Sequence, residues 1–466
     1  MSLQNSYIGF LNPWFFGTFL DLDMEESMLM QYNHYLSTQD EKQQRQLVEA
    51  VLSQYPREQA AEFVCRVTAL SHEVKHFHDL LLSPWTSGLF RILFDIYFNI
   101  KILLVELVHD NCTRVGLPIT VWAQTDATLL AHHELSIPSP RLRQVINRFN
   151  RHYKEMKILV DNGASHPLWW KFMLESAAFN VQAQESWNAF SESAASALCE
   201  YVTRDKTYIC ANEFLRNFFY RELGYQINNA TMNAIYFLAL CGEYADDYPH
   251  ERAFGFLKFL KKRREVVAGE NNIIELFNDY LSLSDRTNIK QSFDISQALT
   301  RDMLQRKKQA LKTSDIDPML SSILTKQLDI LKQYLQARQR MIELYLSSPV
   351  AYHHPQQYRE RSEEYPGPQV FFTSVRGLKW SKQLSRAYHA VVWAGVSQSG
   401  ERAVHVMRRK TPFGSSLFNG KGWSELFIWA LTANTLLEGQ TEIKPFDESL
   451  REIWRREGIT LIDMPR

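Results

Sequence analysis

Two histidines and a glutamate stand at the spacing of a metal site in residues 72–76, which read His-Glu-Val-Lys-His. Residues four apart lie on one face of a helix, so His72 and His76 can share one ion. Two imidazoles and a carboxylate suit zinc and leave a fourth position for water. Glu73 would then lie beside that water as a general base. The motif therefore predicts metal-assisted hydrolysis, and the plain alternative is a helix with two ordinary histidines.

The residues around the motif predict the helix that it needs. Apolar residues recur at steps of three and four, namely Val64, Val67, Leu70, Val74, Phe77 and Leu81. Pro56 suits the first turn of this helix, and Ser83-Pro84 ends it. Lys75 falls outside the stripe and is expected to face solvent. Asp79 shares the face of the histidines, so it is expected to accept a proton from a ligand imidazole, to be a ligand itself, or to be a solvated carboxylate.

A zinc site of this kind needs a third protein ligand, usually from a later helix. Glu175 begins Glu-Ser-Ala-Ala on a predicted helix that Pro167 opens, and its small residues would let the two helices approach closely. Glu192 begins a second Glu-Ser-Ala-Ala, and residues 132–134, His-His-Glu, precede a proline-rich turn. We favour Glu175, with Glu192 second. Which residue stabilises an oxyanion is left open among His78, His109 and Tyr201.

Composition limits the classes of protein that fit. The 466 residues are 45% hydrophobic and 22% charged, which excludes wholesale disorder. Lys and Arg number 52, as do Asp and Glu, so no global field recruits nucleic acid or an anionic membrane. The basic runs at 258–264 and 408–410 are expected to be solvated, and nucleic-acid binding is not expected. No phosphate-loop or dinucleotide motif is found.

The cysteines and the apolar segments predict a reduced, cytoplasmic protein. The five cysteines are scattered without a Cys-x-x-Cys pair, which is a poor disulfide framework and gives no cysteine-type zinc site. The first residues lack the basic region and cleavage site of a signal peptide. The longest apolar stretch, 89–108, carries a charge every four to six residues, so no membrane span is expected.

Periodicity predicts a mainly helical chain in four parts. These are an N-terminal segment (1–55), a core around the motif (56–210), a helical region (211–350) and a C-terminal region (369–466). A polar, proline-bearing connector at 352–368 marks the last boundary. Beyond it, short strands are predicted at 370–374, 389–396 and 403–407, followed by helices in the tail.

Residues 71–88, SHEVKHFHDLLLSPWTSG, resemble a loosely characterised group of bacterial HExxH proteins. In that group an aromatic residue follows the second histidine, a polar or acidic residue comes next, and a turn rich in Thr, Ser and Pro ends in Gly. Residues 174–178, Leu-Glu-Ser-Ala-Ala, with Gln182 are similar to a later helix of the group. The resemblance covers about 54–210. The gap from His76 to Glu175 is longer than is common in well-known gluzincins.

This resemblance implies a gluzincin-type metallopeptidase, with His72, His76 and Glu175 as Zn2+ ligands and Glu73 as base. The fold class implied is mainly α, a zincin-like metallopeptidase core with helical additions and a small α+β C-terminal region. Some members of such groups look like phage-defence or toxin-type proteases, which implies a bacterial defence or toxin-like role. The expected function is a zinc-dependent endopeptidase with a protein substrate and a regulatory protein partner. The alternative is a non-catalytic helical scaffold or interaction protein whose metal site is vestigial or structural.

Overall fold

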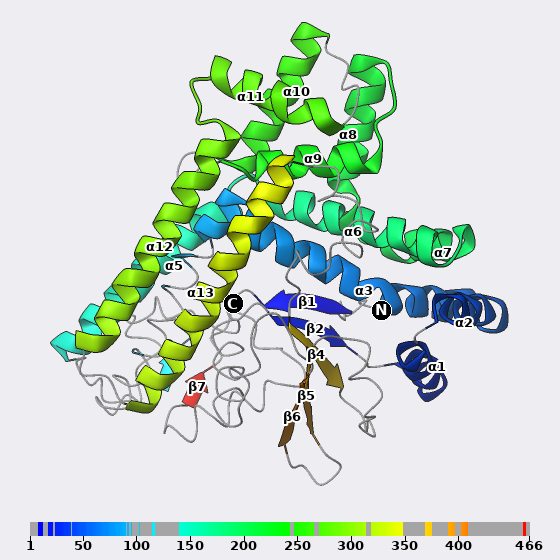
Figure 1. The fold of residues 1–466 in the computed structure, drawn as a ribbon, viewed down its shortest axis with the longest axis horizontal. Coiled ribbons are helices and arrows are strands. Elements are labelled where there is room, and N and C mark those ends of the chain that lie inside the picture. The colour runs from blue at the N-terminus through cyan, green and yellow to red at the C-terminus, as the bar shows by residue number, and fades with distance from the viewer. Residues whose placement is uncertain are drawn as a thin grey trace. The chain divides into compact units, whose positions relative to one another are not determined.

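The structure is a computed structural model, and the chain is mainly helical, as predicted (Figure 1). It describes residues 8–12, 17–21, 24–38, 40–89, 91–92, 95, 102, 114–116, 139–242, 247–264, 270–313, 318–347, 369–374, 390–396, 402–408 and 460–462. The predicted apolar helix at 89–108 lies mostly outside these residues, and the predicted tail helices lie wholly outside them.

The helices before residue 205 are α1 (Glu26–Ser37), α2 (Glu41–Gln54), α3 (Arg57–Leu82), α5 (Pro140–Asp161), α6 (Trp170–Ala189) and α7 (Glu192–Val202). The 3-10 helix η2 (Lys206–Tyr208), α8 (Cys210–Phe218) and the π-helical turn η3 (Phe219–Leu223) follow. The later helices are α9 (Asn229–Ala239), α10 (Pro249–Arg263), α11 (Glu270–Leu283), α12 (Ile289–Thr313) and α13 (Pro318–Ser347).

A five-stranded sheet combines strands from the two ends of the sequence. Its order is β1 (Gly9–Asn12), β2 (Gly17–Asp21), β4 (Gln369–Ser374), β5 (Ala390–Val396) and β6 (Arg402–Arg408). The central pairs β2–β4 and β4–β5 are parallel, whereas β1–β2 and β5–β6 are antiparallel. The sequence did not predict β1 and β2, because each is too short to show a period. A second, two-stranded sheet pairs β3 (Arg114–Gly116) with β7 (Thr460–Ile462).

The chain divides into two compact units. The first holds residues 1–88, 162–305 and 330–417, and therefore α3, α6, α7 and the five-stranded sheet. The second holds 89–161, 306–329 and 418–466, including α5 and the two-stranded sheet. All residues of the candidate site described below belong to the first unit.

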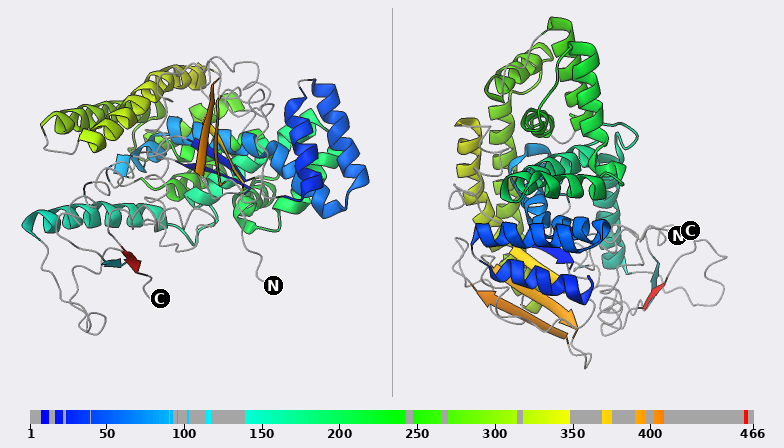
Figure 2. Two further views of the ribbon diagram at one scale, coloured as in Figure 1. Left: turned by 90° about the horizontal axis from the view of Figure 1, so that it is seen from below. Right: turned by 90° about the vertical axis from the view of Figure 1, so that its right-hand side faces the viewer.

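One apolar cluster of the first unit gathers around the N-terminal half of α3. Helices α1, α2 and α7 pack against it, and Figure 2 shows α1 and α2 beside α3. This cluster includes Tyr32, Val48, Phe63, Val64, Ala194 and Leu198, each of which is almost completely buried. Strands β1 and β2 also contact α3, and Figure 1 shows them next to it.

A buried amide cluster ties α6 to α8 and α9. The Asn180 side-chain nitrogen donates to Asn212 Oδ1 at 3.1 Å and to Asn233 Oδ1 at 2.8 Å. Asn212 donates back to Asn180 Oδ1 at 2.8 Å, and the Tyr236 hydroxyl donates to Asn212 Oδ1 at 2.9 Å. Because buried amides are costly unless paired, this network favours one alignment of the three helices.

The structure bears on two of the sequence expectations, the absence of a membrane span and the reduced state of the cysteines. Among the described residues, no helix combines the length and the apolar character that a membrane span requires. Four of the five cysteines are described, and these four are free thiols, with Cys65 and Cys241 buried.

Candidate metal centre

Helix α3 carries the motif and ends six residues after it, at Leu82. Its last carbonyls would lack partners, as at any helix end. The Thr86 hydroxyl donates to Asp79 O at 2.7 Å, and the buried Arg338 guanidinium donates to Leu82 O at 3.2 Å. The predicted stop at Ser83-Pro84 is confirmed, since α3 runs from Arg57 to Leu82.

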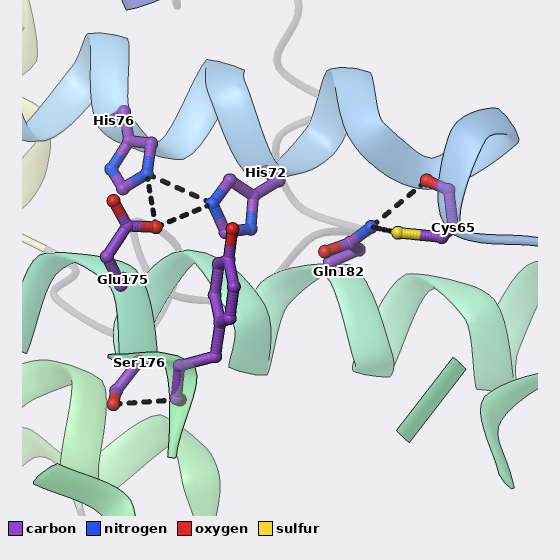
Figure 3. Close-up of polar contacts among 7 residues, drawn as sticks. Cys65, His72, His76, Glu175, Ser176 and Gln182 are labelled. Atoms are coloured by element: carbon purple, nitrogen blue, oxygen red, sulfur yellow. Dashed lines mark hydrogen bonds and ion pairs between the residues drawn. The ribbon is translucent and has the colours of Figure 1, made fainter. Parts of the chain in front are cut away.

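Helix α6 lies antiparallel to α3, and Figure 3 shows the two side by side. Gln182 holds them together, because its side-chain nitrogen donates to Cys65 O at 3.2 Å and to Thr68 Oγ1 at 3.1 Å. Ala177 and Ala178 are buried in α6, so small residues accompany the close approach that the sequence predicted. This packing brings Glu175 opposite the two histidines.

Three ligand-type atoms converge between α3 and α6. His72 Nε2 lies 3.0 Å from His76 Nε2 and 3.1 Å from Glu175 Oε2, and His76 Nε2 lies 3.3 Å from Glu175 Oε2 (Figure 3). An ion with tetrahedral bonds of about 2.1 Å would separate its ligand atoms by about 3.4 Å. Among the described residues, these side chains form the one group whose ligand atoms gather in this way.

The cluster is largely but not fully withdrawn from water. The side chains of His72, His76 and Glu175 are 9%, 14% and 21% exposed. Burial alone would raise the pKa of Glu175, but the charges and hydrogen bonds of His76 and His72 outweigh it and hold the pKa well below its usual range. Glu175 therefore stays an anion, the form in which a carboxylate binds a metal.

Glu73 is the second buried carboxyl group of the site. Its Oε2 atom is buried and has no hydrogen-bond partner among the described residues. Burial raises the pKa of Glu73 to about 8; the charge of His72 opposes this, and the charge of Glu175 adds to it. Gly9 of β1 packs directly against the Glu73 carboxyl group. A methyl group added at Gly9 would lie only 2.8 Å from Glu73 Oε1.

The donor set fits a zinc ion. Two imidazole nitrogens and one carboxylate oxygen are the ligands of many catalytic zinc sites. The unpartnered Glu73 carboxyl belongs to the residue after His72. This is where a general base for a water molecule in the fourth coordination position of the ion is expected. The structure thus brings together His72, His76 and Glu175, the three side chains that the sequence singled out as ligands.

Lys75 and Asp79 are placed differently from the sequence expectation. The prediction that Lys75 faces solvent is wrong, because its side chain is 1% exposed and forms an ion pair with Asp79. Burial lowers the pKa of Lys75, which the charge of Asp79 opposes. Asp79, 2% exposed, is thus paired with a lysine four residues away and is neither solvated nor part of the ligand cluster. The Lys75 ammonium also lies 5.9 Å from the centre of the Phe237 ring in α9.

The other candidates lie elsewhere or cannot be placed. Glu192 is exposed in the first turn of α7 and is outside the ligand cluster. Residues 132–134 and His109 lie outside the described residues. His78 is buried, and Tyr201 belongs to α7 with the Arg204 guanidinium 5.8 Å from its ring centre.

Tyr208 is a neighbour of the site that sequence reasoning missed. Its ring meets the His72 ring edge-on, with 5.7 Å between the two centres. It lies in η2, a three-residue helix that is too short to show a periodic pattern. No local signal in the sequence therefore connects it with the motif.

No family model, no curated protein and no solved structure matches the chain. What the site can do therefore follows from its geometry and its donor atoms.

Proposed function

We propose that the chain is a zinc-dependent endopeptidase, in which His72, His76 and Glu175 hold the ion and Glu73 is the general base. The observation that carries this proposal is the convergence of three ligand atoms within 3.0–3.3 Å of one another. A second carboxyl group, buried and unpartnered among the described residues, adjoins them in the chain. A structural metal site needs no such free carboxyl.

The chemistry divides between the ion and the protein. Bound zinc supplies a Lewis acid that polarises the scissile carbonyl and activates water. The Glu73 carboxylate takes the proton of the attacking water and delivers it to the leaving amine. Without the ion, burial raises the pKa of Glu73 to about 8. The positive charge of a bound ion would lower this pKa and favour the carboxylate, the form that accepts the proton of the water.

The neighbouring strand supports a peptide as substrate. β1 is at one edge of the five-stranded sheet, and among the described strands only β2 pairs with it. An extended peptide can add to an exposed edge through backbone hydrogen bonds. Gly9 places this strand in contact with Glu73, so a peptide beside β1 would pass close to the base.

Two measurements on the purified protein test the proposal. Elemental analysis is expected to find about one zinc per chain. A proteome-derived peptide library, with mass spectrometry of new termini, is expected to show cleavage by the parent protein. Glu73→Gln is expected to retain zinc and lose cleavage, while Glu192→Gln, an exposed glutamate of α7, serves as the matched control and keeps both.

Three outcomes would contradict the proposal. They are a parent protein without stoichiometric zinc, a parent protein without zinc-dependent cleavage, or a Glu73→Gln protein that cleaves as the parent does. A scaffold with a vestigial site would instead keep its function after His76→Ala.

A further inference from the structure

Peptide hydrolysis needs a hydrogen-bond donor besides the metal ligands and the base. As water adds to the carbonyl carbon, the carbonyl oxygen gains negative charge, and a preorganised donor lowers the barrier. The donor must be rigid, close to the ligand cluster and uncommitted to another partner. Tyr208 meets these three conditions in the described part of the chain.

The backbone of Tyr208 is fixed to the helix that carries Glu175. The Ser176 hydroxyl donates to Tyr208 O at 2.9 Å, and Ser176 is fully buried and follows Glu175 in α6 (Figure 3). Asp205 caps η2 by accepting from Thr207 N at 2.8 Å. A displacement of Tyr208 would therefore break contacts on both sides of the short helix.

The side chain of Tyr208 reaches the site. Its ring is edge-on to His72. The phenol lies close enough to Glu175 and Glu73 for the charge of each to act on it. No contact among the described residues gives its hydroxyl a hydrogen-bond acceptor. The phenol hydrogen is thus available for a hydrogen bond to a ligand.

We propose that the Tyr208 hydroxyl donates a hydrogen bond to the carbonyl oxygen of the peptide substrate as that oxygen becomes anionic. The inference rests on the proposed peptidase function and adds a catalytic residue to it. The phenol keeps its proton throughout, so no bond of Tyr208 forms or breaks in the reaction.

The other two described candidates fit this role less well. The Tyr201 ring packs with Arg204, and burial together with Glu62 raises its pKa, so Tyr201 faces a different carboxylate. His78 lies in α3 beside Phe77 and is 1% exposed, which leaves no room for a substrate at that ring.

The test is Tyr208→Phe, with Tyr201→Phe as the matched control. On a peptide that the parent protein cleaves, Tyr208→Phe is expected to lower kcat about 100-fold, with KM within about twofold because the bond strengthens only in the transition state. Zinc content is expected to stay at the parent value. Tyr201→Phe is expected to leave kcat, KM and zinc content unchanged.

A second readout does not depend on turnover. Methylphosphonate is a tetrahedral oxyanion, and its binding to the cobalt-substituted protein can be followed by the visible absorption of Co2+. Tyr208→Phe is expected to weaken this binding about tenfold or more, since a hydrogen bond to a charged oxygen is lost. Tyr201→Phe is expected to bind methylphosphonate as the parent does.

The outcomes separate this inference from the function on which it rests. If the parent does not cleave, or Glu73→Gln cleaves equally well, the proposed function fails and the inference fails with it. If those results hold but Tyr208→Phe keeps both kcat and methylphosphonate affinity, only the inference is wrong. Loss of zinc in Tyr208→Phe would also overturn it, because Tyr208 would then support the ligands and not the substrate.

Discussion

Replacing Glu73 by Gln is expected to make the metal-free protein more resistant to unfolding at high pH than the parent. Burial raises the pKa of Glu73 from 4.5 to about 8 in the folded chain. The folded state therefore keeps this proton up to about pH 8, whereas the unfolded chain releases it near pH 4.5. The stability that the protonated group gives is fully present below pH 4.5 and is lost as the pH rises through 8. Gln carries no such proton.

The size of the effect follows from the pKa difference. At 1.36 kcal/mol per pKa unit, a difference of about 3.5 corresponds to about 5 kcal/mol of unfolding free energy. Between pH 5.5 and pH 9 the parent should lose about 3 kcal/mol of this relative to Glu73→Gln. The Glu73 side chain is almost fully buried, so little of the effect is screened by solvent.

Urea unfolding of the EDTA-treated proteins, followed by tryptophan fluorescence at the two pH values, measures this difference. The unfolding free energy of Glu73→Gln minus that of the parent is expected to increase by about 3 kcal/mol from pH 5.5 to pH 9. Glu192→Gln, at an exposed position, is the control and should show no such change. A difference that is constant with pH, or that favours the parent at pH 9, would refute the reasoning.

Three further changes have expected outcomes. Glu175→Gln should weaken zinc binding, measured by competition with a chelator, by more than the roughly 10–100-fold that loss of an outer partner costs, while Glu192→Gln should bind as the parent does. Asp79→Asn should lower the unfolding free energy by about 3–5 kcal/mol, because it leaves Lys75 charged and buried; Lys75→Met with Asp79→Leu should recover most of this in the same urea assay. Gly9→Ala should lower kcat about tenfold or more at unchanged zinc content, because the added methyl displaces the base.

Local periodicity allowed the two helices that carry the ligand residues to be predicted. The 3.6-residue repeat fixes which residues share a face, so the stripe from Val64 to Leu81 is enough to place His72 and His76 together. The small residues after Glu175 indicated a helix that could approach closely, and α6 does so. The prediction of a mainly helical chain is confirmed for the same reason.

Features that depend on distant parts of the chain could not be predicted. β2 pairs with β4 across about 350 residues of sequence, and neither strand alone shows that partner. Lys75 looked like a surface lysine, because the stripe of α3 does not show that Phe237 of α9 lies near this side chain. Gly9 and Tyr208 reach the site through such long-range packing, so their roles emerge only from the three-dimensional arrangement.

The most direct test of the proposed zinc site is X-ray diffraction from zinc-loaded crystals on both sides of the zinc absorption edge. The account predicts one anomalous peak per chain, about 2.0–2.2 Å from His72 Nε2, His76 Nε2 and a Glu175 carboxylate oxygen. Zinc-loaded crystals without such a peak, in which the three side chains bond only to one another, would contradict it.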